Sequence, residues 1–210
     1  MSHLVLVRHG KSEWNKLGLW TGLTDIDLSP EGRAEARHIG ETIRDIKIEK
    51  AFVSKLKRAQ QTFEEIKKVL QRPDLKADAH SALNERDYGV HTGKNKWQIK
   101  EAVGEEDFNK IRRGWDAFVE GGENLKDVYE RVVPHYKEHV HPHLSKGSNV
   151  LVVAHGNSIR ALVKHLENIS NEKIPELEIG FGEVYCYKFD RDGKIIGKEI
   201  RAMNPEKGNI

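Results

Sequence analysis

The sequence predicts an α/β fold, a three-layer sandwich in which a largely parallel sheet is flanked by helices. Two short apolar runs, at 4–7 and 150–153, are typical of strands buried on both faces. Segments with apolar residues at helical spacing follow each strand, and this alternation favours parallel pairing. The chain has 210 residues, and a single domain usually has about 100–200.

The first strand and helix are predicted within residues 4–46. The apolar run 4–7 ends where Arg8-His9-Gly10 replaces apolar residues with polar ones. Ser29-Pro30 is typical of a helix start, with serine as the N-cap and proline at the first helical position. Apolar residues at spacings of three and four then predict the buried helix face, formed by Ala36, Ile39, Ile43 and Ile46.

A second strand, at 51–53, ends at Ser54 and is followed by a second helix. The helix should end before Pro73, and its apolar face comprises Leu56, Ala59, Phe63, Ile66 and Leu70. Residues 80–124 are rich in glycine, and we expect loops there with one or two short helices.

The C-terminal half resumes the alternation. A helix is predicted from 125 to 136, with Pro134 causing a kink or a break. The strand at 150–153 ends in Ala154-His155-Gly156-Asn157, and a helix follows with Ile159, Leu162, Val163 and Leu166 on one face. Residues 184–189 and 195–196, joined by Asp192-Gly193, predict a β-hairpin.

We therefore expect one domain over residues 1–210, with a loop-rich insert at about 80–124 and a mobile polar tail at 202–210.

Charge and cysteine content exclude several function classes. There are 35 Lys and Arg residues against 33 Asp and Glu, a net charge of +2, so we expect no nucleic-acid partner. No segment has the roughly 18 apolar residues of a membrane span, and no signal peptide is recognisable. The single cysteine, Cys186, suits a reducing compartment, so we expect a cytoplasmic protein without a membrane partner.

Two predicted strands end in His-Gly, at His9-Gly10 and His155-Gly156. If these strands are parallel neighbours, both imidazoles enter one pocket beyond the carboxyl end of the sheet. Arginines that suit phosphate oxygens are found near strand ends or in the insert, at Arg8, Arg58, Arg86, Arg112 and Arg113. A neutral histidine can attack phosphorus, while arginines and a second histidine neutralise the developing charge. Glu85 is a candidate for the proton transfer. No phosphate-binding glycine loop or magnesium motif is present, and we expect no metal.

Several segments then resemble one family. They are LVRHG at 6–10 with SEWN at 12–15, WTGLTDIDLSPEG at 20–32, SKLKRAQQT at 54–62, LNERDYG at 83–89, IRRGW at 111–115, GENLKDVYERVVP at 122–134 and AHGNSIRALVKHLENIS at 154–170. Together they resemble the histidine phosphatase superfamily and, within it, the cofactor-dependent phosphoglycerate mutases.

The resemblance implies a phosphoglycerate mutase-like fold and a role for each matching residue. His9 would carry the phosphoryl group, Arg8, Arg58 and His155 would complete the phosphate pocket, and Glu85 would donate and accept the proton. Substrate would be bound by Arg8, Ser12, Asn15, Thr21, Gly22, Arg58, Glu85, Arg86, Tyr88, Lys96, Arg112, Arg113, Gly156 and Asn157. The implied reaction interconverts 3-phosphoglycerate and 2-phosphoglycerate in glycolysis and gluconeogenesis, primed by 2,3-bisphosphoglycerate. The implied partners are small phosphoglycerates, and the family includes monomers and homo-oligomers.

The sequence departs from the family at several positions. Lys11 replaces an acidic or amide residue, Asp87 is more typical of the phosphatase branch, and Gly180-Phe181-Gly182-Glu183 replaces a T-G-V-P segment. The insert and the tail are shorter than in long mutases. A site left more open would admit water and favour hydrolysis.

Three alternatives to a mutase remain. The first is a phosphomonoester hydrolase on this scaffold, and the second is a non-catalytic protein that binds phosphate ligands. Because the candidate nucleophile His9 is present, the second is disfavoured. The third is a metal site in HYKEHVHPH, at His135, His139, His141 and His143. A solvated helix face explains these histidines better.

Overall fold

The structure is a computed structural model that describes residues 1–202. Its sheet has six strands in the order β3-β2-β4-β1-β5-β6. The strands are β1 Ser2–Arg8, β2 Lys50–Ser54, β3 Ala77–His80, β4 Val150–Ala154, β5 Val184–Phe189 and β6 Ile195–Arg201. The first four pair in parallel, and β5 is antiparallel to both of its neighbours. The predicted α/β sandwich is confirmed.

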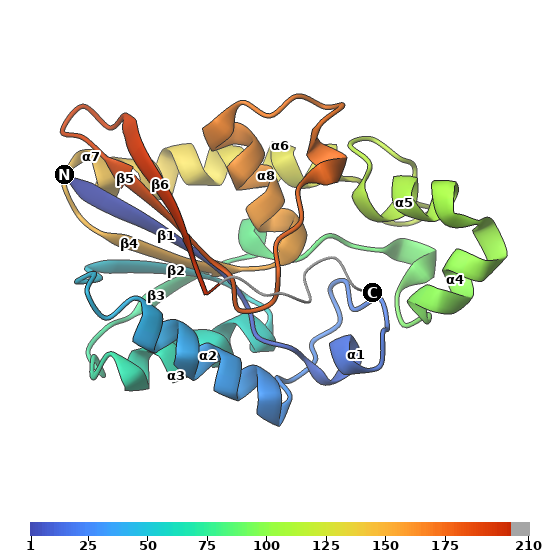
Figure 1. Ribbon diagram of the computed structural model, residues 1–210, viewed down its shortest axis with the longest axis horizontal. Helices are drawn as coiled ribbons and strands as arrows, with labels where there is room; N and C mark the ends of the chain where they lie inside the picture. Colours follow the sequence, from blue (N-terminus) through green and yellow to red (C-terminus); the bar gives the residue numbers. More distant parts are fainter. Residues whose placement is uncertain (203–210) are drawn as a thin grey trace.

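Helices cover both faces of the sheet. As drawn in Figure 1, α2 and α3 lie below it, α6, α7 and α8 lie above it, and α4 and α5 project to the right. The α-helices are α1 Glu13–Lys16, α2 Pro30–Thr42, α3 Lys57–Val69, α4 Lys96–Val103, α5 Glu105–Arg113, α6 Leu125–His135, α7 His141–Ser145 and α8 Gly156–Glu167. Short helical turns are η1 Ser81–Leu83, η2 Gly89–His91, η3 Tyr136–Val140 and η4 Ile174–Glu176.

The apolar run of β4 is explained by its place in the sheet. Its alternate residues enter two different cores. Val150, Val152 and Ala154 pack with α6 and α8 on one face, while Leu151 and Val153 pack with α2 and α3 on the other. All five are fully buried. Among residues 1–202, no helix has the length and apolar character that crossing a membrane requires.

Helix α2 begins as predicted and ends early. The Ser29 side chain accepts a hydrogen bond from the Gly32 N–H at 3.1 Å, and Pro30 is the first helical residue. The helix ends at Thr42, so Ile43 and Ile46 lie beyond it, although both remain buried. Burial, and not helical structure, explains their spacing.

Pro134 does not break its helix. The helical backbone continues through His135, then adopts π-helical hydrogen bonding in η3 before α7 begins. Proline has no N–H to donate and its ring crowds the carbonyl one turn earlier. A change to wider turns is a common response to a defect in the hydrogen-bond ladder.

Three further points concern the sequence predictions. The edge strand β3, with sequence ADAH, was not predicted because it is short and mostly exposed. The 80–124 segment contains the expected short helices, α4 and α5, with η1 and η2 before them. Apart from Ala202, the tail predicted to be mobile lies outside the described residues.

Candidate active site

The two His-Gly segments meet at one edge of the sheet. Strands β1 and β4 are parallel neighbours, with Arg8 opposite Ala154. The next residues, His9 and His155, therefore lie side by side, with ring centroids 4.8 Å apart. Both rings are buried, with 2% and 0% exposure. The two imidazoles are neighbours, as expected, but only His9 lines a cavity.

The environment of His9 favours a nucleophile. Its Nδ1 lies 2.6 Å from the Gly10 carbonyl oxygen, which can only accept, so Nδ1 carries the proton and Nε2 keeps its lone pair. Burial, reinforced by Arg58 and Arg8, holds the pKa of His9 well below its usual range. The ring is therefore neutral at pH 7. Gly10 allows this approach, because a Cβ there would lie 2.2 Å from the Gly32 carbonyl oxygen.

Two arginines are fixed beside His9. Arg58 donates to the carbonyl oxygens of Thr24 and Gly22, each at 2.8 Å. Arg8 donates to the Ile179 carbonyl oxygen, and its guanidinium lies 3.6 Å above the Phe181 ring. In the described part of the chain, Nε of each arginine is buried without a hydrogen-bond partner. An oxyanion beside His9 would satisfy these donors.

Glu85 is held by three donors on one oxygen. Its Oε1 accepts from the backbone N–H of Arg86 at 2.7 Å and from the backbone and side-chain amides of Asn157 at 3.2 and 3.1 Å. Asn157 also donates to the Tyr88 hydroxyl at 2.9 Å. The carboxyl group is thus fixed in orientation at the cavity wall.

Two small neighbouring cavities, of about 40 and about 70 Å³, occupy this edge. The first is lined by Arg8, His9, Asn15, Leu19, Trp20, Thr21, Gly22, Arg58, Glu85, Tyr88 and Lys96. The second shares five of these residues and adds Arg112, Arg113, Gly156, Asn157, Arg160, Glu178 and Ile179. Among these lining residues, six cations face two carboxylates, so the space suits a multiply charged anion.

Three predicted site residues do not line either cavity. His155 is fully buried beside His9. Ser12 caps α1, where its hydroxyl donates to Asn15 Oδ1 at 2.8 Å and accepts from the Asn15 N–H. Arg86 is fully buried and donates to the carbonyl oxygens of Ile111 and Arg112 at the end of α5. Ser12 and Arg86 therefore orient residues that reach the cavities.

Other lining residues were not predicted. Arg160 donates to Asn157 Oδ1 at 3.0 Å, and its position one helical turn after Asn157 is the signal that could have revealed it. Glu178 pairs with Arg113 at 2.7 Å and Arg112 at 3.3 Å. Trp20 directly precedes the predicted Thr21 and Gly22 and lines the same cavity, whereas nothing in the local sequence around Glu178 indicates the site.

The departures at Lys11 and Asp87 lie outside the cavity walls. The Lys11 backbone N–H donates to Glu35 at 2.8 Å. The Asp87 carboxylate accepts from the Gly89 N–H at 2.9 Å, and its own N–H donates to Glu123. Asp87 thus stabilises a turn, and neither residue appears in the lining of the cavities.

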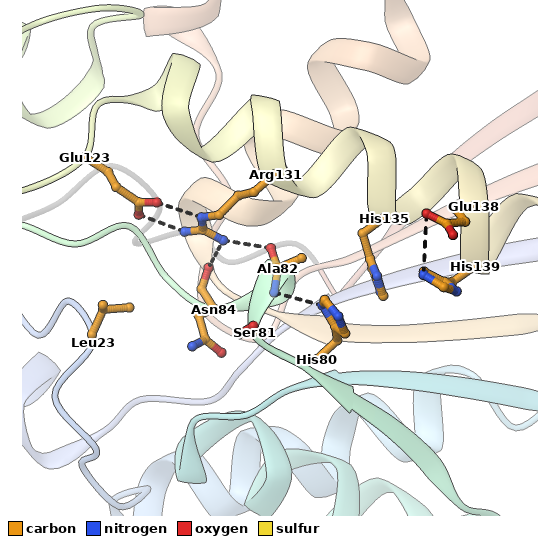
Figure 2. Close-up of a pocket in the computed structure, with 10 residues that line it drawn as sticks. All are labelled: Leu23, His80, Ser81, Ala82, Asn84, Glu123, Arg131, His135, Glu138 and His139. Carbon is orange, nitrogen blue, oxygen red and sulfur yellow. Dashed lines mark hydrogen bonds and ion pairs between the residues drawn. The ribbon is translucent and has the colours of Figure 1, made fainter.

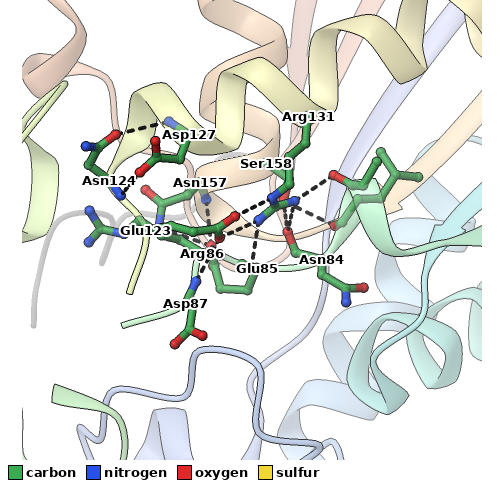
Figure 3. A network of polar contacts seen from close by, with 12 residues as sticks. Asn84, Glu85, Arg86, Asp87, Glu123, Asn124, Asp127, Arg131, Asn157 and Ser158 are labelled. Carbon is green, nitrogen blue, oxygen red and sulfur yellow. Dashed lines mark hydrogen bonds and ion pairs between the residues drawn. The ribbon is translucent and has the colours of Figure 1, made fainter. Parts of the chain in front are cut away.

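Arg131 on α6 fastens the segment that carries Glu85, as Figure 3 shows. Its guanidinium donates to the carbonyl oxygens of Ala82, Asn84 and Glu85 at 2.7, 3.1 and 3.0 Å. Both oxygens of Glu123 accept from the same guanidinium, at 2.7 and 2.9 Å. One planar side chain thus fixes the backbone of this segment.

Replacing Arg131 with methionine should loosen this segment. We expect the free energy of unfolding to fall by about 2 kcal/mol, because three carbonyls and one carboxylate lose a charged donor. We expect kcat to fall tenfold to a hundredfold, because Glu85 is displaced. Urea unfolding and steady-state kinetics measure both effects, with Lys126→Met as the control, since Lys126 is on the exposed face of α6. An unchanged kcat despite lost stability would show that Arg131 does not position Glu85.

A larger pocket, of about 540 Å³, lies beside α6 (Figure 2) and includes part of the histidine-rich segment. The rings of His80 and His135 are stacked, with their centroids 4.3 Å apart, and the ring centroid of His139 lies 4.8 Å from that of His135. Burial, with His80 and His139 nearby, lowers the pKa of His135 to about 4. Within residues 1–202, no group of three or more His, Cys, Asp or Glu side chains is arranged to hold a metal ion.

Comparison with known proteins agrees with this geometry. A sequence model of the histidine phosphatase superfamily (branch 1) matches residues 4–199. The 2,3-bisphosphoglycerate-dependent phosphoglycerate mutase of Mesorhizobium japonicum is 45% identical, over 94% of this chain and 97% of the relative. The phosphoglycerate mutase of Schizosaccharomyces pombe is 44% identical, over 94% of each chain.

Solved structures share the fold at lower identity. A mycobacterial hydrolase superimposes with a TM-score of 0.81 at 25% identity, covering 96% of each chain. A mycobacterial glucosyl-3-phosphoglycerate phosphatase superimposes with a TM-score of 0.79 at 24% identity, covering 97% of this chain and 98% of the other. The chain belongs to the histidine phosphatase superfamily, and its resemblance to the phosphoglycerate mutases of that superfamily is confirmed.

Proposed function

We propose that this protein is a phosphoglycerate mutase that interconverts 3-phosphoglycerate and 2-phosphoglycerate through a phosphohistidine on His9. The observation that carries the proposal is a second group of cations, Lys96, Arg112 and Arg113, in the cavity next to the one that His9 lines. A three-carbon acid needs positive charge for its carboxylate and its other phosphate, as well as for the phosphoryl group at His9. The names of the curated relatives support the same reaction, a cytoplasmic step of glycolysis and gluconeogenesis.

In this mechanism His9 Nε2 attacks phosphorus, because Nδ1 is committed to the Gly10 carbonyl oxygen. Arg8 and Arg58 lie beside the ring and neutralise charge on the transferring oxygens. Burial lowers the pKa of Arg58 to about 10. This side chain therefore still carries its charge at neutral pH. Both arginines are anchored to backbone carbonyls before ligand arrives, so no reorganisation is needed.

Glu85 exchanges the proton of the substrate hydroxyl. It gives a proton to the oxygen that leaves phosphorus and removes one from the oxygen that attacks the phosphohistidine. The contacts of Oε1 with Arg86 and Asn157 hold the carboxyl group in place. Substrate that fills these small cavities excludes water, which would otherwise accept the phosphoryl group.

The residues present fit 2,3-bisphosphoglycerate as the primer. In the described part of the chain, Arg8 and Arg58 have buried Nε donors without a partner beside His9. Arg112 and Arg113 line the neighbouring cavity, and Lys96 lines both cavities. When bound, the bisphosphate supplies the phosphoryl group that His9 carries. Glu178 already pairs with both Arg112 and Arg113, so an anion there shares these arginines with it.

The affinity for phosphoglycerate should depend on the charge of Lys96. Burial, followed by Arg112 and Arg8, lowers the pKa of Lys96 to about 8. A lowered pKa means that the cation is lost earlier as pH rises, so we expect KM for 3-phosphoglycerate to rise about tenfold between pH 7 and 9.5. In Lys96→Arg the side chain stays charged over this range, so the rise in KM should vanish. The control is Lys94→Arg, an exposed neighbour. An equal rise in Lys96→Arg would exclude Lys96 as the cause.

The assay that tests the function follows 3-phosphoglycerate with and without added 2,3-bisphosphoglycerate, and counts both 2-phosphoglycerate and free phosphate. We expect fast isomerisation that depends on the bisphosphate, with little phosphate released. Free phosphate without isomerisation would instead identify a phosphomonoester hydrolase.

A further inference from the structure

The imidazole of His155 lies between two neighbouring strand ends. Strand β4 lies between β2 and β1 in the sheet, so His155 follows β4 with Ser54 on one side and His9 on the other. His155 Nε2 lies 2.7 Å from the Ser54 hydroxyl oxygen. Ser54 is fully buried and lines neither cavity. The hydrogen-bond partners of Ser54 therefore determine which nitrogen of the His155 ring carries the proton.

The direction of the Ser54 proton is determined by Asn84. The Lys55 backbone N–H donates to Asn84 Oδ1 at 3.0 Å, so the atom at that position is the amide oxygen. The Ser54 hydroxyl lies 2.9 Å from the same oxygen. Because an amide oxygen can only accept, the single Ser54 proton is donated to Asn84. The Leu56 backbone N–H donates to Ser54 Oγ at 3.1 Å.

Ser54 Oγ can then only accept from His155. Nε2 must carry a proton to complete the 2.7 Å contact. Burial, together with Arg58, His9 and Arg8, holds the pKa of His155 well below its usual range, so the resting ring is neutral and Nδ1 carries a lone pair. In the described part of the chain, this Nδ1 is buried and has no partner.

We propose that Ser54 and Asn84 are positioning residues that hold His155 in its Nε2–H tautomer, so that Nδ1 receives a proton from the incoming phosphate ester. The second part of this proposal rests on the proposed function. A phosphate monoester has a second pKa of about 6. Its monoanion gives the O–H proton to Nδ1 and keeps the electron pair on oxygen. The ester becomes a dianion, and His155 becomes an imidazolium that donates to it.

This arrangement couples charge to ligand binding. The imidazolium would have both N–H groups satisfied, Nε2–H by Ser54 and Nδ1–H by the phosphoryl oxygen. Without ligand the buried ring stays neutral, which avoids an uncompensated cation beside Arg8 and Arg58. Ser54 and Asn84 gain and lose no proton in the exchange.

The tautomer can be read directly from the ¹⁵N shifts of His155 in long-range ¹H–¹⁵N NMR spectra of the whole protein. In the resting protein we expect Nε2 protonated and Nδ1 unprotonated. On addition of orthovanadate, as a phosphoryl probe, both nitrogens should become protonated. A proton on Nδ1 in the resting protein, or an unprotonated Nδ1 with bound vanadate, would overturn the proposal. The resting spectrum is independent of activity, so failure of the mutase assay with the expected tautomer would reject only the proposed function.

Two substitutions at Asn84 sharpen the test. In Asn84→Ala the Ser54 proton is released and can be donated to Nε2, so we expect the resting tautomer to change to Nδ1–H and kcat to fall at least tenfold. In Asn84→Asp an acceptor oxygen remains, and the Nε2–H tautomer should be retained. Ser158→Ala is the control, because the Ser158 hydroxyl donates to the backbone carbonyls of Leu83 and Asn84 and makes no hydrogen bond to the Asn84 side chain. If Asn84→Ala keeps the Nε2–H tautomer, Asn84 does not direct the proton. If Asn84→Ala fails to fold, the spectra of the wild type and of Asn84→Asp still test the proposed tautomer of His155.

Discussion

Replacing His9 with alanine should abolish phosphoryl transfer, with kcat/KM falling by at least about 10⁴-fold, as expected for loss of a nucleophile. We expect the neighbouring His155 not to take its place, because its Nε2 is engaged by Ser54 and its Nδ1 takes up the proton of the incoming ester. Arg8 and Arg58 are anchored to backbone carbonyls, so ligand should still bind. Steady-state kinetics and titration with inorganic phosphate separate the two effects.

The control for this variant is His38→Ala, because His38 is exposed on α2 and distant from the sheet edge. It should retain wild-type turnover. Substantial turnover by His9→Ala would contradict covalent catalysis at this residue, whereas loss of phosphate binding would show that the imidazole also holds the pocket together.

The second large effect is expected for Glu85→Gln. Loss of a positioned acid or base should lower kcat by about 10²- to 10⁴-fold. Glutamine has the same shape, and its amide oxygen can keep the hydrogen bonds from Arg86 and Asn157. KM and the free energy of unfolding should therefore change little, which kinetics and urea unfolding will show.

A substrate with a better leaving group separates proton transfer from positioning. Transfer from 2,4-dinitrophenyl phosphate to His9 needs no proton donor, so Glu85→Gln should slow phosphoenzyme formation from this ester far less than from 2,3-bisphosphoglycerate. Glu130→Gln, at an exposed position on α6, serves as the control. Equal slowing of both donors would remove Glu85 from the proton transfer.

The inner strands that the sequence predicted bury apolar residues on both faces, while the hairpin of β5 and β6 was recognisable from its Asp192-Gly193 turn. Strand β4 was recognisable because every residue in it is buried. Strand β3 was not, because an edge strand with exposed residues has no apolar pattern to detect. The start of α2 was recognisable from Ser29 and Pro30, which act locally, while its end depends on tertiary packing.

In the candidate site, too, some residues could be predicted from the sequence and others could not. The two His-Gly segments follow predicted strands, so the topology of parallel sheets predicts that they meet. The direction in which a side chain points is not encoded locally. Arg86 and Arg112 look alike in sequence, yet Arg86 binds backbone carbonyls while Arg112 lines a cavity. Glu178 comes from a distant segment, and only the folded chain brings it to Arg112 and Arg113.

The central claim is that His9 passes a phosphoryl group to phosphoglycerate and not to water. The most direct measurement labels the protein with ³²P from 2,3-bisphosphoglycerate and then chases it with unlabelled 3-phosphoglycerate. Quenching at alkaline pH preserves phosphohistidine, and mass spectrometry locates the label. We predict label on His9 that moves to phosphoglycerates within a turnover. Label on another residue, or release of the label as free phosphate, would contradict the account.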